Sequence, residues 1–136
     1  MRSYRFDDFT SLDDLRLHEE DMPKPQRGEI LVRARAVSLN YRDLAMLLGR
    51  YVSDSKTGLI PTSDATGEIV AVGEGVDGYK VGDRVMGAFH SRWFGGQMPK
   101  TINVDGYGNQ KDGWLVEYKV VSQEAVIALP DGLSFE

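Results

Sequence analysis

Short stretches with strand-like patterning, separated by glycine-containing turns, run through most of this chain. In Glu29–Val37, apolar residues alternate with Arg33 and Arg35, which is the period-two pattern of a strand with one buried face. The compact apolar run in Gly67–Val72 is typical of a buried strand. Further strands are expected at Met1–Phe6, Leu15–Glu19, Val81–Phe89, Trp114–Val121 and Val126–Leu129. Together they predict a mainly β fold with a small helical part, either a partly open barrel or a sandwich.

One helix is expected directly after Asn40. Asn40 is a favourable N-cap, Asp43 suits the positive end of the helix dipole, and Gly49 ends the pattern. The expected apolar stripe consists of Tyr41, Leu44, Ala45 and Leu48. Residues His90–Gly113 hold five glycines and little periodicity, so we expect a long loop there.

Composition excludes several classes of partner. The chain has 136 residues, enough for one domain, and a net charge of −5 that argues against nucleic acid or an anionic membrane as a partner. It has no cysteine, so it holds no disulfide and no thiolate zinc site. The longest apolar run is five residues, too short to span a bilayer. Because Asp7 and Asp8 lie where a secretory signal is apolar, we expect a cytoplasmic protein.

One segment matches the sequence of a dinucleotide-binding motif but lacks the helix that the motif requires. Residues Gly73–Gly78 spell G-x-G-x-x-G after an apolar run. A loop that binds pyrophosphate needs a helix directly after it, because the helix N-terminus receives the phosphates. Here a Gly82-Asp83 turn follows within four residues, and then another strand pattern. The segment therefore predicts a turn between strands, and any nucleotide-binding fold must lie outside this chain.

The C-terminal residues Leu129–Glu136 have the pattern of a strand end, a turn and a helix start. Ser134 is a favourable N-cap, and Glu136 suits a first helical turn. We therefore expect residues 1–130 to form a catalytic, substrate-binding domain. Residues 131–136 are then the start of a crossover to a nucleotide-binding domain that this chain does not contain.

Five motifs occur in order along the chain: NYRD at 40–43, GRY at 49–51, PTSDATGEIVAVG at 61–73, YKVGDRV at 79–85 and LPDGLS at 129–134. In this order they resemble the N-terminal, chaperonin-10-like (GroES-like) catalytic domain of the medium-chain dehydrogenase/reductase superfamily. Residues 38–43 and the Ser63-Asp64 pair are most similar to its zinc-independent, NADP-linked alcohol dehydrogenase and quinone oxidoreductase branch. The resemblance implies a twisted, partly open β-barrel joined to a C-terminal Rossmann domain that binds NADP or NAD.

The zinc ligands of related enzymes are replaced here. In zinc-dependent relatives, the metal is held by a Cys aligned with Asn40 and by a His-Glu pair aligned with Ser63-Asp64. Zinc prefers three strong N, S or O ligands, and Asn40 and Ser63 are poor ones. The proton-relay hydroxyl and imidazole of those relatives align with Arg42 and Ala45. The resemblance therefore implies a site without metal.

The missing metal favours one kind of reaction. Oxidising an unactivated alcohol needs a Lewis acid or a base at the hydroxyl. A quinone or an α,β-unsaturated carbonyl is already polarised, so a hydride from the nicotinamide needs only a hydrogen-bond donor for the oxyanion and a later proton. Reduction of such a substrate is therefore favoured over alcohol oxidation. The alternatives are a chaperonin-10-like binding module with no enzymatic activity and an NADP-dependent alcohol dehydrogenase with a residual zinc site.

The resemblance implies a set of site residues. Asn40 and Tyr51 are the candidate catalytic residues, because Asn40 would face the nicotinamide and Tyr51 aligns with a proton-donating or carbonyl-anchoring tyrosine of related enoyl reductases. The candidate substrate pocket consists of Tyr41, Ser63, Asp64 and Trp93. Asn40 and Arg42 are candidate cofactor contacts, Arg42 through a phosphate. For these residues the alternatives are purely structural roles: helix capping for Asn40, packing on the barrel for Tyr51 and a solvated helix face for Arg42. The expected partners are a small-molecule substrate and the chain's own Rossmann domain, in a parent homodimer or homotetramer.

Overall fold

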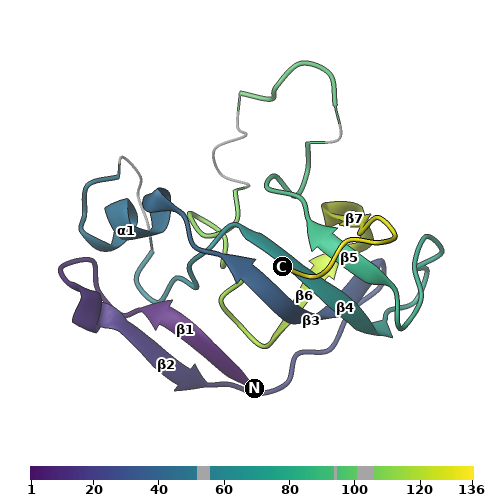
Figure 1. The fold of residues 1–136 in the computed structure, drawn as a ribbon, viewed down its shortest axis with the longest axis horizontal. Helices are drawn as coiled ribbons and strands as arrows, with labels where there is room; N and C mark the ends of the chain where they lie inside the picture. Colours follow the sequence, from purple (N-terminus) through teal and green to yellow (C-terminus); the bar gives the residue numbers. More distant parts are fainter. Residues whose placement is uncertain (52–55, 94, 101–105) are drawn as a thin grey trace.

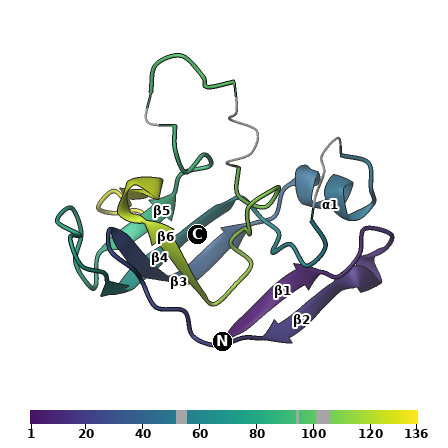
Figure 2. The same cartoon turned by 180° about the vertical axis from the view of Figure 1, so that it is seen from behind.

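The computed structural model describes residues 1–51, 56–93, 95–100 and 106–136. Within these ranges, a two-stranded antiparallel hairpin lies beside an antiparallel sheet with the strand order β6-β3-β4-β5-β7 (Figures 1 and 2). The hairpin is formed by β1 (Arg2–Phe6) and β2 (Leu15–Glu19), and the larger sheet by β3 (Glu29–Ser38), β4 (Asp64–Val72), β5 (Arg84–Gly87), β6 (Tyr118–Ser122) and β7 (Val126–Ala128). The helical elements are α1 (Tyr41–Leu47) and two short 3-10 turns, η1 (Leu12–Asp14) and η3 (Gln123–Ala125).

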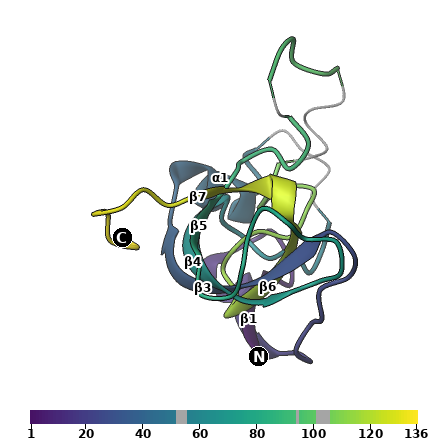
Figure 3. The same cartoon turned by 90° about the vertical axis from the view of Figure 1, so that its right-hand side faces the viewer.

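The expected mainly β architecture with one α-helix is confirmed, and the curved, open sheet fits a partly open barrel. Figure 3 looks along the long axis and shows the larger sheet curving around a shared interior. That interior holds one apolar cluster, which includes Ile30, Ile69, Val85 and Trp114, each at most 1% exposed. No helix in the described part of the chain is long and apolar enough to cross a membrane.

The chain before β6 joins the two sheets. The sequence predicts a strand from Trp114, but β6 begins at Tyr118. The preceding residues pair with β1 instead, since the Tyr4 N–H donates to the Leu115 carbonyl at 2.9 Å and the Glu117 N–H donates to the Arg2 carbonyl at 3.0 Å. The hairpin is therefore fixed to the larger sheet by backbone hydrogen bonds.

The G-x-G-x-x-G segment lies in the connection between β4 and β5, which are antiparallel neighbours. A side chain at Gly73 would place its Cβ 1.8 Å from the Gln26 carbonyl oxygen, so that position needs glycine to let two backbones approach. The next element after the segment is a strand, which confirms the prediction of a turn between strands.

Helix α1 ends as predicted but buries a different face. The Gly49 N–H donates to the Met46 carbonyl and the Arg50 N–H to the Ala45 carbonyl, with Gly49 at φ +63°, which is a glycine-dependent helix stop. The buried apolar side chains are Ala45, Met46 and Leu47. Of the expected stripe, Ala45 is buried, but Tyr41 and Leu44 are wrong, because they are 80% and 43% exposed. Met46 and Leu47 instead pack with Phe6 and Leu59 in a second apolar cluster.

Candidate active site

Three of the sequence-predicted site residues meet where β3 ends and β4 begins. The Asn40 side-chain nitrogen Nδ2 donates to Asp64 Oδ2 at 2.9 Å, and the Ser63 hydroxyl donates to the same oxygen at 2.6 Å. Asn40 follows β3 and precedes α1, while Asp64 is the first residue of β4 and pairs with Ser38. The antiparallel pairing of these two strands therefore brings Asn40 to the Ser63-Asp64 pair.

Asp43 connects the start of α1 to this cluster. Its carboxylate is buried, and Oδ2 accepts a hydrogen bond from the Asn40 backbone N–H at 2.8 Å. Its other oxygen, Oδ1, accepts from the Thr62 backbone N–H at 3.1 Å. Because Thr62 directly precedes the Ser63-Asp64 pair, Asp43 fixes both segments that carry the site. The sequence indicates only the helix-terminal role of Asp43, and its contact with Thr62 has no sequence signal.

Thr62 has an unusual backbone conformation. It is fully buried and has a φ of +67°, in the left-handed region that β-branched residues rarely adopt. Its carbonyl accepts from the Trp114 N–H at 3.1 Å, and a Cβ at Gly113 would lie 2.1 Å from that same carbonyl oxygen. Such a conformation costs about 1–3 kcal/mol and persists only where surrounding contacts enforce it. The residue that presents Ser63-Asp64 is thus held in a strained conformation by its neighbours.

A cavity of about 390 Å³ opens beside this cluster. Ser38, Asp64 and Thr66 contribute to its lining from β3 and β4, and the C-terminal residues Phe135 and Glu136 form another part. Asp64 is the member of the cluster that lines this cavity, while Asn40 and Ser63 are not among the lining residues.

The C-terminal residues 133–135 pack against the larger sheet. The guanidinium groups of Arg35 and Arg84 lie over the Phe135 ring, 5.4 and 4.5 Å from its centroid. The Thr66 hydroxyl donates to the Phe135 carbonyl, and the Arg84 guanidinium donates to the Leu133 carbonyl. These contacts place the end of the chain against the strands that line the 390 Å³ cavity.

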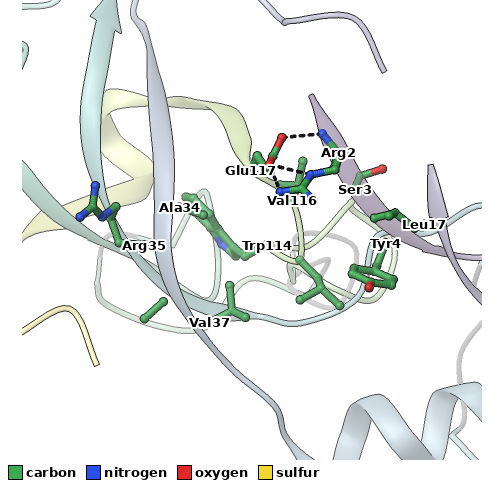
Figure 4. A pocket seen from close by; sticks show the side chains of 12 residues that line it. Arg2, Ser3, Tyr4, Leu17, Ala34, Arg35, Val37, Trp114, Val116 and Glu117 are labelled. Atoms are coloured by element: carbon green, nitrogen blue, oxygen red, sulfur yellow. Dashed lines mark hydrogen bonds and ion pairs between the residues drawn. The ribbon is translucent and has the colours of Figure 1, made fainter. Parts of the chain in front are cut away.

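A separate cavity of about 340 Å³ lies between the hairpin and β3 (Figure 4). Tyr4 and Leu17 line it from the hairpin and Val37 from β3, and an Arg2–Glu117 ion pair of 2.7 Å lies beside them. None of the sequence-predicted site residues lines this cavity, so we do not include it in the candidate active site.

The remaining predicted pocket residues lie apart from the cluster or on exposed surface. Tyr41 is 80%, Tyr51 42% and Trp93 40% exposed. Trp93 stacks edge-on at 6.0 Å from the His90 ring. Among the described residues, the structure gives no hydrogen bond from these three side chains to the Asn40–Ser63–Asp64 cluster, and residues 52–55, which follow Tyr51, lie outside the described ranges. Their roles in the site stay predictions.

Arg42 is directed toward the glycine-rich segment. Its Nη2 donates to the Tyr107 carbonyl at 2.7 Å, and its guanidinium lies 5.0 Å from the Phe89 ring centroid. These two contacts give Arg42 a structural role in attaching α1 to that segment. Its predicted contact with a cofactor phosphate is untested.

The family of alcohol dehydrogenase GroES-like domains matches residues 26–131, and the chain belongs to this family. The resemblance inferred from the motifs is thereby confirmed at the level of the family. Its zinc-independent branch stays a prediction.

The chain is also similar to individual proteins. It is 35% identical over 131 residues to a zinc-type alcohol dehydrogenase-like protein of Schizosaccharomyces pombe, a match that covers 96% of this chain and 38% of that protein. It is 31% identical to a 2-methylene-furan-3-one reductase of Solanum lycopersicum, over 99% of this chain and 32% of the reductase. The crystal structure of a putative alcohol dehydrogenase from Sinorhizobium meliloti superimposes with a TM-score of 0.88 at 33% identity, over 98% of this chain and 40% of that one. The chain thus spans less than half the length of these relatives.

Proposed function

We propose that this chain is the substrate-binding half of a zinc-independent NAD(P)H-dependent oxidoreductase that reduces a quinone or an α,β-unsaturated carbonyl. The observation that carries the proposal is the Asn40–Ser63–Asp64 cluster beside the 390 Å³ cavity. The relatives include a protein named as a reductase and others named as alcohol dehydrogenases, which supports oxidoreductase chemistry in general. Because this chain spans 38% of the first relative, the activity is proposed for the longer protein.

The donor set of the cluster does not fit zinc. A zinc site needs ligands with free lone pairs, whereas Asn40 presents its amide N–H to Asp64. The Ser63 hydroxyl occupies the same carboxylate oxygen as a second donor. In the described part of the chain, no group of three or more His, Cys, Asp or Glu side chains is arranged to hold a metal ion. The reaction is therefore derived without a metal.

The nicotinamide would supply the hydride, and the residues of this chain would stabilise the charge that develops on the substrate oxygen. The Asn40 amide has two N–H donors, of which one binds Asp64 at 2.9 Å. Its other contact is a long one of 3.4 Å with the Ser38 carbonyl, so a substrate oxyanion can compete for that donor. Asp64 orients the amide, and the phenolic O–H of Tyr51 is the proposed proton donor.

The proposal is tested on the whole protein that contains this chain. We expect it to oxidise NADPH or NADH with a quinone or an enone, to retain this activity after treatment with a zinc chelator, and to contain no stoichiometric zinc. Asn40→Ala should lower kcat about a hundredfold, as loss of one oxyanion donor does elsewhere. Val81→Ala, at an exposed position, is the matched control. Stoichiometric zinc, or inactivation by the chelator, would refute the zinc-independent reaction.

A further inference from the structure

Phe135 packs against the larger sheet although the chain on both sides of it is exposed. Leu129 is buried, and its N–H donates to the Arg84 carbonyl at 2.9 Å. Residues 130–134 and Glu136 are exposed, whereas Phe135 is partly buried. The chain therefore leaves the sheet after Leu129 and returns to it at Phe135.

Side chains from three neighbouring strands hold Phe135 in this place. The guanidinium carbon atoms of Arg35 on β3 and Arg84 on β5 lie 5.4 and 4.5 Å from its ring centroid. A cation over an aromatic ring is attracted by the negative face of the ring. Thr66 lies on β4, the strand between them, and donates its hydroxyl to the Phe135 carbonyl. Because all three residues belong to paired strands, the sheet itself fixes the position of Phe135.

Arg84 holds more of this segment than Arg35 or Thr66 does. Besides its contact with the Phe135 ring, its guanidinium donates a hydrogen bond to the Leu133 carbonyl. The planar guanidinium group can stack on a ring and donate hydrogen bonds at the same time. Arg84 thus fixes residues 133–135 at two points, one on the backbone and one on a side chain.

The segment held in this way forms part of the wall of the 390 Å³ cavity. Phe135 lines the cavity together with Asp64, Thr66 and Met86, and the last two are paired opposite each other on β4 and β5. Arg84 is not among the lining residues. It lies two residues before Met86 and therefore on the same face of β5. Its influence on the cavity must run through Phe135.

We propose that Arg84 is a positioning residue for the substrate. It holds Phe135 where the ring forms a wall of the cavity, and it thereby fixes the shape of the space beside Asp64. The inference rests on the proposed function, because it takes this cavity as the substrate site. A wall contacts the substrate in the ground state and in the transition state alike. Its loss should therefore weaken substrate binding more than it slows the chemical step.

The anchoring of Phe135 is tested on the chain 1–136 without any reaction. Carboxypeptidase Y should remove the exposed Glu136 readily and then release Phe135 slowly. In Arg84→Met the release of Phe135 should be about fivefold faster, because proteolysis follows the population of the opened segment. Arg27→Met, at a side chain that is 78% exposed and pairs with Glu74, is the matched control and should behave as the parent chain. Equal release rates in Arg84→Met and the parent would overturn the anchoring role.

The positioning of the substrate is tested by kinetics on the whole protein that contains this chain. Arg84→Met should raise the KM for a quinone or an enone about tenfold and leave kcat within about twofold. Arg84→Lys keeps a cation and a donor, so it should recover part of this loss. A merely structural role would lower the amount of active enzyme, and hence the apparent kcat, with KM unchanged. An unchanged KM in Arg84→Met would overturn the proposal.

A double variant tests the route through Phe135. Phe135→Leu removes the ring that the guanidinium contacts and should itself raise KM. Since both residues act through the same wall, Arg84→Met should add less than about twofold to the KM of Phe135→Leu. A full tenfold effect in that background would overturn the route through Phe135.

Failure of this inference can be told apart from failure of the proposed function. If the whole protein oxidises alcohols and does not reduce quinones or enones, the proposed function is refuted. The KM of Arg84→Met for the alcohol then tests the positioning role in the same way. Turnover of neither class of substrate would refute both.

Discussion

The side-chain amide of Asn40 donates a 2.9 Å hydrogen bond to the carboxylate of Asp64, which lies 24 residues further along the chain. Asn40 directly precedes α1, and Asp64 is the first residue of β4. Their contact therefore depends on whatever fixes those two starting points relative to each other. Asp43 has this role, because one of its oxygens binds the Asn40 N–H and the other the Thr62 N–H.

We predict that Asp43→Ala destabilises the chain by about 3 kcal/mol, because it removes a charged acceptor from two backbone donors, one of them buried. Asp43→Asn keeps one acceptor oxygen and should cost about half as much. The free energy of unfolding from urea denaturation measures both effects. Asp77→Ala, at an exposed position, should change it by less than about 0.5 kcal/mol. A loss no larger for Asp43→Ala than for this control would contradict the bridging role.

A substitution at Gly113 tests whether the neighbouring backbone holds Thr62 in its strained conformation. We predict that Gly113→Ala severely destabilises the chain, by more than about 3 kcal/mol, since its Cβ would lie 2.1 Å from the Thr62 oxygen and 2.2 Å from the Pro61 oxygen. Neither backbone atom can move without disturbing the residues that precede Ser63-Asp64. Gly78→Ala is the control, because the nearest atom to its Cβ is the end of the Gln123 side chain at 3.5 Å. Thermal unfolding of both variants measures the difference. Similar melting temperatures would show that the backbone at Pro61 and Thr62 adapts easily to a side chain at position 113.

The sequence predicts where the strands and the helix lie better than it predicts which of their faces is buried. Period-two patterning and glycine turns place the strands, and Gly49 places the helix end, because these are local backbone properties. The predicted buried face of α1 is wrong in part because residues 44–48 are all apolar, so several stripes satisfy the same spacing. Which stripe is buried depends on packing against Phe6 and Leu59, which are distant in sequence.

In the candidate site too, the sequence identifies residues but not the features that depend on contacts between distant segments. Motif resemblance identifies Asn40, Ser63 and Asp64, and the structure brings them together. The positive φ of Thr62 has no sequence signal, because glycine or asparagine is the usual residue in that conformation. It follows from non-local contacts with Asp43 and the Gly113–Trp114 segment. Lys119 likewise lies in a strand pattern that does not reveal its contacts with the rings of Tyr107 and Trp114.

The two tryptophans of the chain should respond differently to a quencher in solution. Trp93 is 40% exposed, while Trp114 is 1% exposed and packs in the core. We predict two fluorescence populations in acrylamide titrations, one quenched readily and one shielded. Trp93→Phe should leave only the shielded population, and Tyr41→Phe, a substitution at another exposed aromatic, should leave both. If a single accessible population remained in Trp93→Phe, the core position of Trp114 would be wrong.

Acid should weaken the contact between β1 and Glu20, the residue that directly follows β2. Two hydrogen bonds from Arg5 to this carboxylate, at 2.7 and 2.9 Å, hold the pKa of Glu20 at about 2, against an ordinary value of 4.5. Partial burial opposes this shift, and the Ser3 hydroxyl reinforces it. A carboxyl with a lowered folded-state pKa stabilises the fold fully above its unfolded value. The stabilisation, of about 2 kcal/mol, should therefore disappear as the pH falls from about 4.5 toward 2.

Glu20→Gln isolates this contribution from those of Asp14 and Glu117, whose pKa values are also lowered by hydrogen bonds from Thr10 and Arg2 respectively. At pH 7 the variant should be about 2 kcal/mol less stable than the parent chain, and the difference should shrink toward zero near pH 2. Glu74→Gln, at a 78% exposed position, should follow the parent chain at every pH. Urea denaturation at several pH values measures all three chains. A constant difference between Glu20→Gln and the parent down to pH 2 would mean that the Arg5–Glu20 pair does not titrate in this range.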